Sequence, residues 1–120
     1  MKHLKSGRKF GRVKNQREAM LKTMLGSLIM KEKIETTEAK AKELKIVIDR
    51  IINRAKQSKT EAKKVSVIRA LNNKLPAMAV KKLTGAFLDK FTERGSGYTR
   101  VIKIGARQSD SAKIAVIEFV

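Results

Sequence analysis

The sequence contains no cysteine and no tryptophan, one proline and one histidine. Without cysteine, a disulfide framework and a thiolate metal site are both excluded. The single histidine, His3, stands near the start of the chain, which argues against a Ser/His/Asp or Cys/His catalytic arrangement. The 11 acidic residues are scattered among lysines rather than clustered as metal ligands would be. We therefore expect no enzymatic activity, no catalytic residue, no metal and no cofactor.

Long apolar runs are also missing, so the sequence predicts no membrane-spanning helix. The segment most similar to a secretory signal, 20–30, contains Lys22 and repeats its apolar residues every three or four positions. The glycines at 95 and 97 lack the third glycine and the strand–helix context of a nucleotide-binding loop. We expect an unprocessed, cytoplasmic protein with no small-molecule substrate.

Positive charge is abundant, since 29 Lys and Arg oppose 11 Asp and Glu for a formal net charge of +18. Residues 1–17 carry seven cations, no acid and two glycines, and residues 18–120 still have a net charge of +11. Such an imbalance favours a polyanionic partner, most often nucleic acid. We divide the chain into a basic extended arm, 1–14, which we expect to order on its partner, and one globular domain, 15–120.

Apolar residues at helical spacing predict four helical segments. Asn15 with Glu18 reads as a capping box before a helix over 16–31, and Thr37 as the cap of a helix over 38–56. Ser58 with Glu61 predicts a third helix ending near Asn72, with Val65, Ile68 and Leu71 inward. Pro76, at a first helical position, opens a fourth segment that Gly85 breaks or bends, with Val80, Leu83, Phe87, Leu88 and Phe91 apolar.

The pattern changes after the loop 93–97 to extended segments rich in Val, Ile, Phe and Tyr. Segments 98–104 and 113–120 should pair as an antiparallel hairpin, and 33–37 is a natural third strand. The predicted fold class is α+β. About four helices pack on a small three-stranded mixed or antiparallel sheet, with the basic arm extending from it.

Zinc-finger pairs, an aromatic ribonucleoprotein motif and a basic helix running into heptads are all missing from the sequence. Lys and Arg are instead dispersed over many predicted faces. This favours binding by backbone charge and shape, which suits folded RNA with its accessible phosphates and 2′-hydroxyls.

Three blocks of the sequence resemble one known family. The first comprises 1–3 (MKH), 6–12 (SGRKFGR) and 17–21 (REAML), and the second is 36–44 (TTEAKAKEL). The third is 97–103 (GYTRVIK) with Arg107, Asp110, Ala112 and the IEF of 117–119. The three blocks follow one another in order along the whole chain. Together they resemble the bacterial large-subunit ribosomal protein family numbered seventeen. Departures are Gln16 in place of His, Phe10 in place of Leu, and the lack of a Gly before Asp110.

The resemblance implies a non-catalytic constituent of the large ribosomal subunit, in the cytoplasm, near the exit-tunnel side. The implied partners are 23S rRNA and neighbouring large-subunit ribosomal proteins, with no membrane. The RNA-binding residues carried over by the match are Lys2, His3, Lys5, Arg8, Lys9, Arg12, Arg17, Lys40, Tyr98, Arg100 and Arg107.

Several of these proposed RNA-binding residues also have an alternative structural interpretation. His3 is also readable as a solvated terminal side chain, Tyr98 as a sheet-core aromatic, and Arg100 as a cross-strand ion-pair partner. Phe10 either stacks on a base or anchors the arm, and a family leucine at its position favours anchoring. A nucleoid-type DNA-binding protein and a binder of anionic membrane surfaces are the competing functions.

Overall fold

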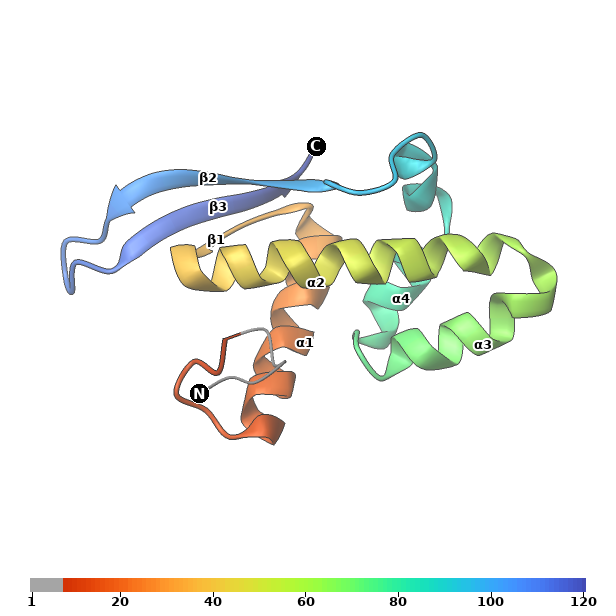
Figure 1. Ribbon diagram of the computed structural model, residues 1–120, viewed down its shortest axis with the longest axis horizontal. Coiled ribbons are helices and arrows are strands. Elements are labelled where there is room, and N and C mark those ends of the chain that lie inside the picture. Colours follow the sequence, from red (N-terminus) through yellow and green to blue (C-terminus); the bar gives the residue numbers. More distant parts are fainter. Residues whose placement is uncertain (1–7) are drawn as a thin grey trace.

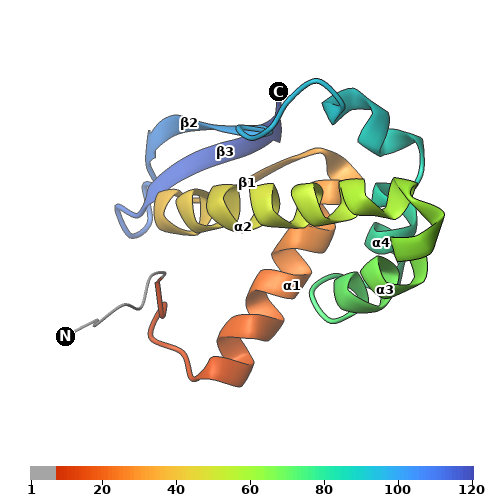
Figure 2. The same cartoon turned by 45° about the vertical axis from the view of Figure 1, so that its right-hand side comes forward.

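The computed structural model describes residues 8–120, and its elements form two layers. Figure 1 shows a three-stranded sheet on one side of the long helix α2 (Glu38–Lys56), with α1 (Lys14–Lys31), α3 (Glu61–Asn72) and α4 (Ala77–Leu83) on the other. Figure 2 shows the same layering from a second direction. The α+β class with four α-helices on a small sheet is confirmed for the described part of the chain.

The sheet is antiparallel, with the strand order β1-β3-β2. Its strands are β1 (Lys33–Thr37), β2 (Thr99–Ala106) and β3 (Lys113–Phe119), so the last strand of the chain is the central one. Ile117 pairs with Ile34 on one side and with Val101 on the other, and these apolar side chains face α2. A register shift between Lys103 and Gly105 interrupts the ladder near the hairpin tip.

Helix α2 covers the sheet because its apolar residues fall on one stripe. The stripe is buried along its whole length and consists of Ala41, Leu44, Ile48, Ile51, Ile52 and Ala55, as the sequence predicts. Thr37 is the residue before the helix, as expected, but its side chain forms no capping hydrogen bond. The predicted bounds of α2 and β1 are confirmed.

Helix α1 begins at Lys14, two residues before the predicted start, and its N-cap residue is Val13. The capping box at Asn15 and Glu18 is therefore wrong, because both residues already lie inside the helix. At the other end Glu32 adopts a left-handed conformation (φ 64°), and its backbone N–H donates to the Leu28 carbonyl at 2.7 Å. This ending turns the chain sharply into β1.

Helix α3 differs from the prediction at its start and in its buried face. Ser58 is the buried residue of a 3₁₀ turn, η1 (Gln57–Lys59), and Thr60 is the residue before α3, so the predicted box at Ser58 and Glu61 is wrong. Val67 and Leu71 point into the core, whereas Val65 is 60% exposed. Residues two apart on a helix lie about 200° apart, so burying Val67 turns Val65 to solvent.

The fourth predicted segment is interrupted at Gly85, as expected, giving α4 and the 3₁₀ helix η2 (Ala86–Phe91). Pro76 precedes α4 with an extended backbone instead of occupying its first turn, which corrects the prediction by one position. Beyond the break, the rings of Phe87, Phe91, Tyr98 and Phe119 form a cluster of edge-to-face and tilted pairs with centroids 5.1 to 5.5 Å apart. This cluster fixes η2 against the end of the sheet.

Candidate nucleic-acid interface

The described part of the arm is a tight turn before α1. The Arg12 backbone N–H donates to the Lys9 carbonyl at 3.1 Å, and its guanidinium donates to the Phe10 carbonyl at 3.0 Å. Phe10 and Gly11 both adopt positive φ angles, 54° and 61°. Lys9 and Arg12 are exposed on this turn and available to a polyanion. The predicted contacts Lys2, His3 and Lys5 lie outside the described residues.

Arg8 is bound to the body of the protein. Its guanidinium donates to the Glu43 carboxylate at 3.3 Å, and Glu43, on α2, is only 8% exposed. A nearly buried carboxylate requires a partner, so this pair holds the turn against α2. Phe10 is half-buried and is not among the residues packed against the described core, so its anchoring role stays a prediction.

Arg17 and Lys40 lie on two different helices. Arg17 is half-buried in the first turns of α1, and Lys40 is half-buried in the first turn of α2. Within residues 8–120 neither side chain forms an ion pair with a carboxylate. Their charges are therefore not neutralised by this part of the chain.

The predicted contacts on the hairpin are both paired with carboxylates. Arg100 donates to Glu118 on the adjacent strand at 3.0 Å, the cross-strand pairing that the sequence left open. At the hairpin tip Arg107 donates to both oxygens of Asp110, at 3.0 and 2.7 Å. This interaction lowers the pKa of Asp110 to about 2, and a hydrogen bond from the Ala112 N–H acts in the same direction. Both arginines remain exposed, so RNA would share or replace these partners.

Tyr98 is fully buried, at 0% exposure, and the sheet-core alternative is the one observed. It lies one residue before β2, and both Tyr98 and Thr99 are buried, whereas Arg100 is exposed. Its hydroxyl accepts from Lys56 Nζ at 2.8 Å and lies within hydrogen-bond distance of Asn53 Oδ1 and the Arg94 carbonyl. The Tyr98 and Gly97 N–H groups donate to Asp49. Tyr98 therefore ties the loop before β2 to α2 and presents no surface to RNA.

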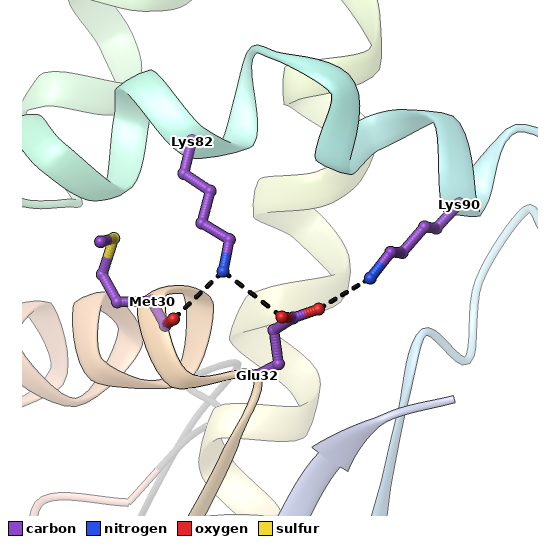
Figure 3. Close-up of polar contacts among 4 residues, drawn as sticks. All are labelled: Met30, Glu32, Lys82 and Lys90. Atoms are coloured by element: carbon purple, nitrogen blue, oxygen red, sulfur yellow. Dashed lines mark hydrogen bonds and ion pairs between the residues drawn. The ribbon is translucent and has the colours of Figure 1, made fainter.

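A second set of cations is used inside the fold. Figure 3 shows Glu32, at the end of α1, between Lys82 of α4 and Lys90 of η2. Its carboxylate lies 2.8 Å from Lys90 Nζ and 3.5 Å from Lys82 Nζ, and Lys82 also donates to the Met30 carbonyl at 3.1 Å. The hydrogen bond from Lys90, against the opposing effect of partial desolvation, lowers the pKa of Glu32 below its ordinary value. These lysines join α1 to the segment 82–90.

Four further cations surround a groove that the sequence did not reveal. The groove has a volume of about 540 Å³ and lies between α1, α2 and the end of α3. Its floor is aliphatic, formed by Leu21, Leu25, Val47, Ile51 and Leu71, and its rim carries Lys22, Arg50, Arg54 and Lys74. The spacing of 47, 50, 51 and 54 indicates one face of a helix, but only packing shows that this face meets α1 and α3.

Other kinds of site are not found in the described residues. No group of three or more His, Cys, Asp or Glu side chains within 8–120 is placed to hold a metal ion. No helix in this same range is long and apolar enough to cross a membrane. Lys and Arg from the turn, α1, α2 and the hairpin are exposed or half-buried on several sides of the molecule. These features define a small, basic α+β protein whose described cations lie on several sides.

Comparison with known proteins gives the family. A family model described as Ribosomal protein L17 matches residues 20–120. The chain is 43% identical over 120 residues to the Large ribosomal subunit protein bL17 of Thermodesulfovibrio yellowstonii, covering 100% of this chain and 87% of that protein. It is 44% identical over 119 residues to the protein of the same name from Staphylococcus carnosus, covering 94% and 98%. The chain belongs to the ribosomal protein L17 family, as its resemblance predicted.

Proposed function

We propose that this protein is a structural constituent of the bacterial large ribosomal subunit, in the cytoplasm, where it binds 23S rRNA near the exit-tunnel side beside other large-subunit proteins. Family membership over nearly the whole chain is the observation that carries the proposal. A net charge of +18 adds an independent reason, because a large folded polyanion neutralises what would otherwise be self-repulsion.

The proposed RNA contacts lie on more than one side of the molecule. Lys9 and Arg12 are on the turn before α1, Arg17 and Lys40 on two helices, and Arg107 at the hairpin tip. Arg8 and Arg100 would act together with their carboxylate partners. Lys2, His3 and Lys5 complete the set from the start of the chain. Contacts so dispersed fit an RNA that folds around the protein, and they supply phosphate binding without reading base sequence.

Sedimentation tests the proposal directly. In lysate of the source bacterium, the chain should co-sediment with large subunits and be released only at high salt, because each Lys or Arg at a phosphate replaces a bound counterion. In a purified system, the logarithm of its affinity for 23S rRNA should fall with the logarithm of salt concentration. A slope that corresponds to fewer than about two phosphate contacts would exclude binding by counterion release. Finding the chain free of ribosomal particles would exclude the role itself.

A further inference from the structure

The groove between α1, α2 and the end of α3 combines an apolar floor with an unneutralised cationic rim. Leu21 and Val47 are half-exposed on the floor, beside the buried Leu25, Ile51 and Leu71. An exposed aliphatic surface of this kind favours an apolar partner. The cations around it come from two helices and a turn, with Lys22 on α1, Arg50 and Arg54 on α2, and Lys74 in the turn after α3.

The positive charges of the rim are not neutralised by carboxylates of the described part of the chain. No carboxylate in residues 8–120 forms an ion pair with Lys22, Arg50, Arg54 or Lys74. The single acid lining the groove, Glu18, also forms no ion pair in that range. Lys22 is held in place by donating to the Asn72 carbonyl at 3.5 Å. Four cations against one carboxylate require acidic groups on the partner for electrostatic complementarity.

We propose that this groove binds an acidic amphipathic segment of a neighbouring protein, whose apolar side chains cover the floor and whose carboxylates meet the rim. The inference rests on the proposed function, since assembly in the large subunit supplies the neighbour. Such recognition is the helix-in-groove mode, in which apolar residues on one face of a segment enter the groove and flanking charges set its orientation.

The shape of the site favours protein over RNA. Unpaired bases are usually held by aromatic rings or by guanidinium planes, and no aromatic residue among 8–120 lines this groove. A single RNA strand also presents one line of phosphates, whereas here the cations surround an aliphatic floor. The chain's own residues 1–7 are a poor match, because Lys2 and Lys5 would face the cationic rim without any acid.

Cross-linking within the assembled particle tests the inference, and the lack of native cysteine makes a single attachment point available. Val47→Cys places a short benzophenone label on the floor, and Leu21→Cys places it on the facing helix. Ile46→Cys is the matched control, since Ile46 is the neighbouring residue on α2, is 51% exposed and does not line the groove. Both floor labels should cross-link to the same acidic protein segment, and the Ile46 label should not.

Charge-reversal variants distinguish a specific effect of the rim cations on cross-linking from a general effect of the protein's positive charge. Arg50→Glu with Arg54→Glu should lower the cross-linking yield from Val47→Cys by about tenfold. Lys63→Glu with Lys64→Glu makes the same change of charge on the exposed start of α3, away from the groove, and should leave the yield unchanged. Equal losses with both pairs would overturn the proposal.

The outcomes distinguish this inference from the function on which it rests. Large subunits are first isolated by sedimentation, and circular dichroism checks that each labelled variant is folded. Absence of the folded chains from the particles would refute the proposed function and this inference with it. Incorporation followed by cross-links to rRNA, to residues 1–7 or to a second copy, or by none above the Ile46 control, would refute the inference alone.

Discussion

Gly26 is the residue at which α1 approaches Pro76, the residue before α4. A Cβ atom at position 26 would lie 2.7 and 2.8 Å from two carbons of the proline ring, which has little freedom to move away. The position has ordinary helical geometry, so contact distance and not backbone conformation requires glycine here.

Gly26→Ala should therefore destabilise the protein even though alanine is the better helix former. Overpacking costs about 1–3 kcal/mol, while the gain in helix propensity is about 1 kcal/mol. We expect a net loss of about 1 kcal/mol in the free energy of unfolding, measured by urea denaturation. In the double variant with Pro76→Ala, the loss due to Gly26→Ala should become a gain. A Gly26→Ala protein more stable than wild type would contradict the contact.

Tyr98 acts through its hydroxyl as well as its ring. The ring packs edge-to-face on Phe91, and the hydroxyl interacts with Lys56, Asn53 and the Arg94 carbonyl. Tyr98→Phe keeps the ring and leaves these partly buried groups with fewer partners. We expect a loss of about 1–3 kcal/mol in the free energy of unfolding with an unchanged denaturant slope. Unchanged stability would show that water replaces the hydroxyl without cost.

Sequence predicted the individual elements well where one periodic pattern determines them. The stripe from Ala41 to Ala55 and the β-branched run before it fixed α2 and β1, because burial on one face leaves little freedom of register. The helix starts were harder to predict. Asn15 and Ser58 have good capping side chains, yet α1 begins after Val13 and α3 after Thr60. Capping preferences of about 1 kcal/mol are outweighed by packing.

The hairpin tip is held by the pair Arg107 and Asp110, and it should respond to acid. The folded pKa of Asp110, about 2, lies below the ordinary value of 3.8, so the charged carboxylate favours the closed tip. This contribution is complete above pH 3.8 and is lost as the pH falls through about 2. The Ala112 amide donates to Asp110, so its NMR shift should titrate with a midpoint near pH 2.

Asp110→Asn is the control for this titration. It preserves the size of the side chain and removes the ionisable group, so the acid-dependent shift of the Ala112 amide should disappear. A wild-type midpoint close to 3.8 would show that the ion pair does not persist in solution. From the sequence, Arg107 and Asp110 were two separate matches to the family. Only the turn between β2 and β3 shows that they bind each other.

At the scale of the whole molecule, the dispersed cations were evident from composition, but their arrangement was not. The groove depends on three helices meeting, and the burial of Tyr98 depends on α2 and the loop before β2 lying together. Both are long-range contacts between segments that local periodicity treats as independent. Arg8 is a similar case, because its carboxylate partner lies 35 residues away on α2.

Deleting residues 1–12 should separate RNA affinity from folding. The core begins within α1, so the shortened protein should keep its helical circular dichroism, while five Lys and Arg are lost. If each contacts a phosphate, the salt slope for binding 23S rRNA should decrease by about four. Glu43→Gln in the full-length chain keeps every cation and weakens only the hold on Arg8. Its slope should therefore remain that of the wild type. An unchanged slope after the deletion would assign RNA binding to the body alone.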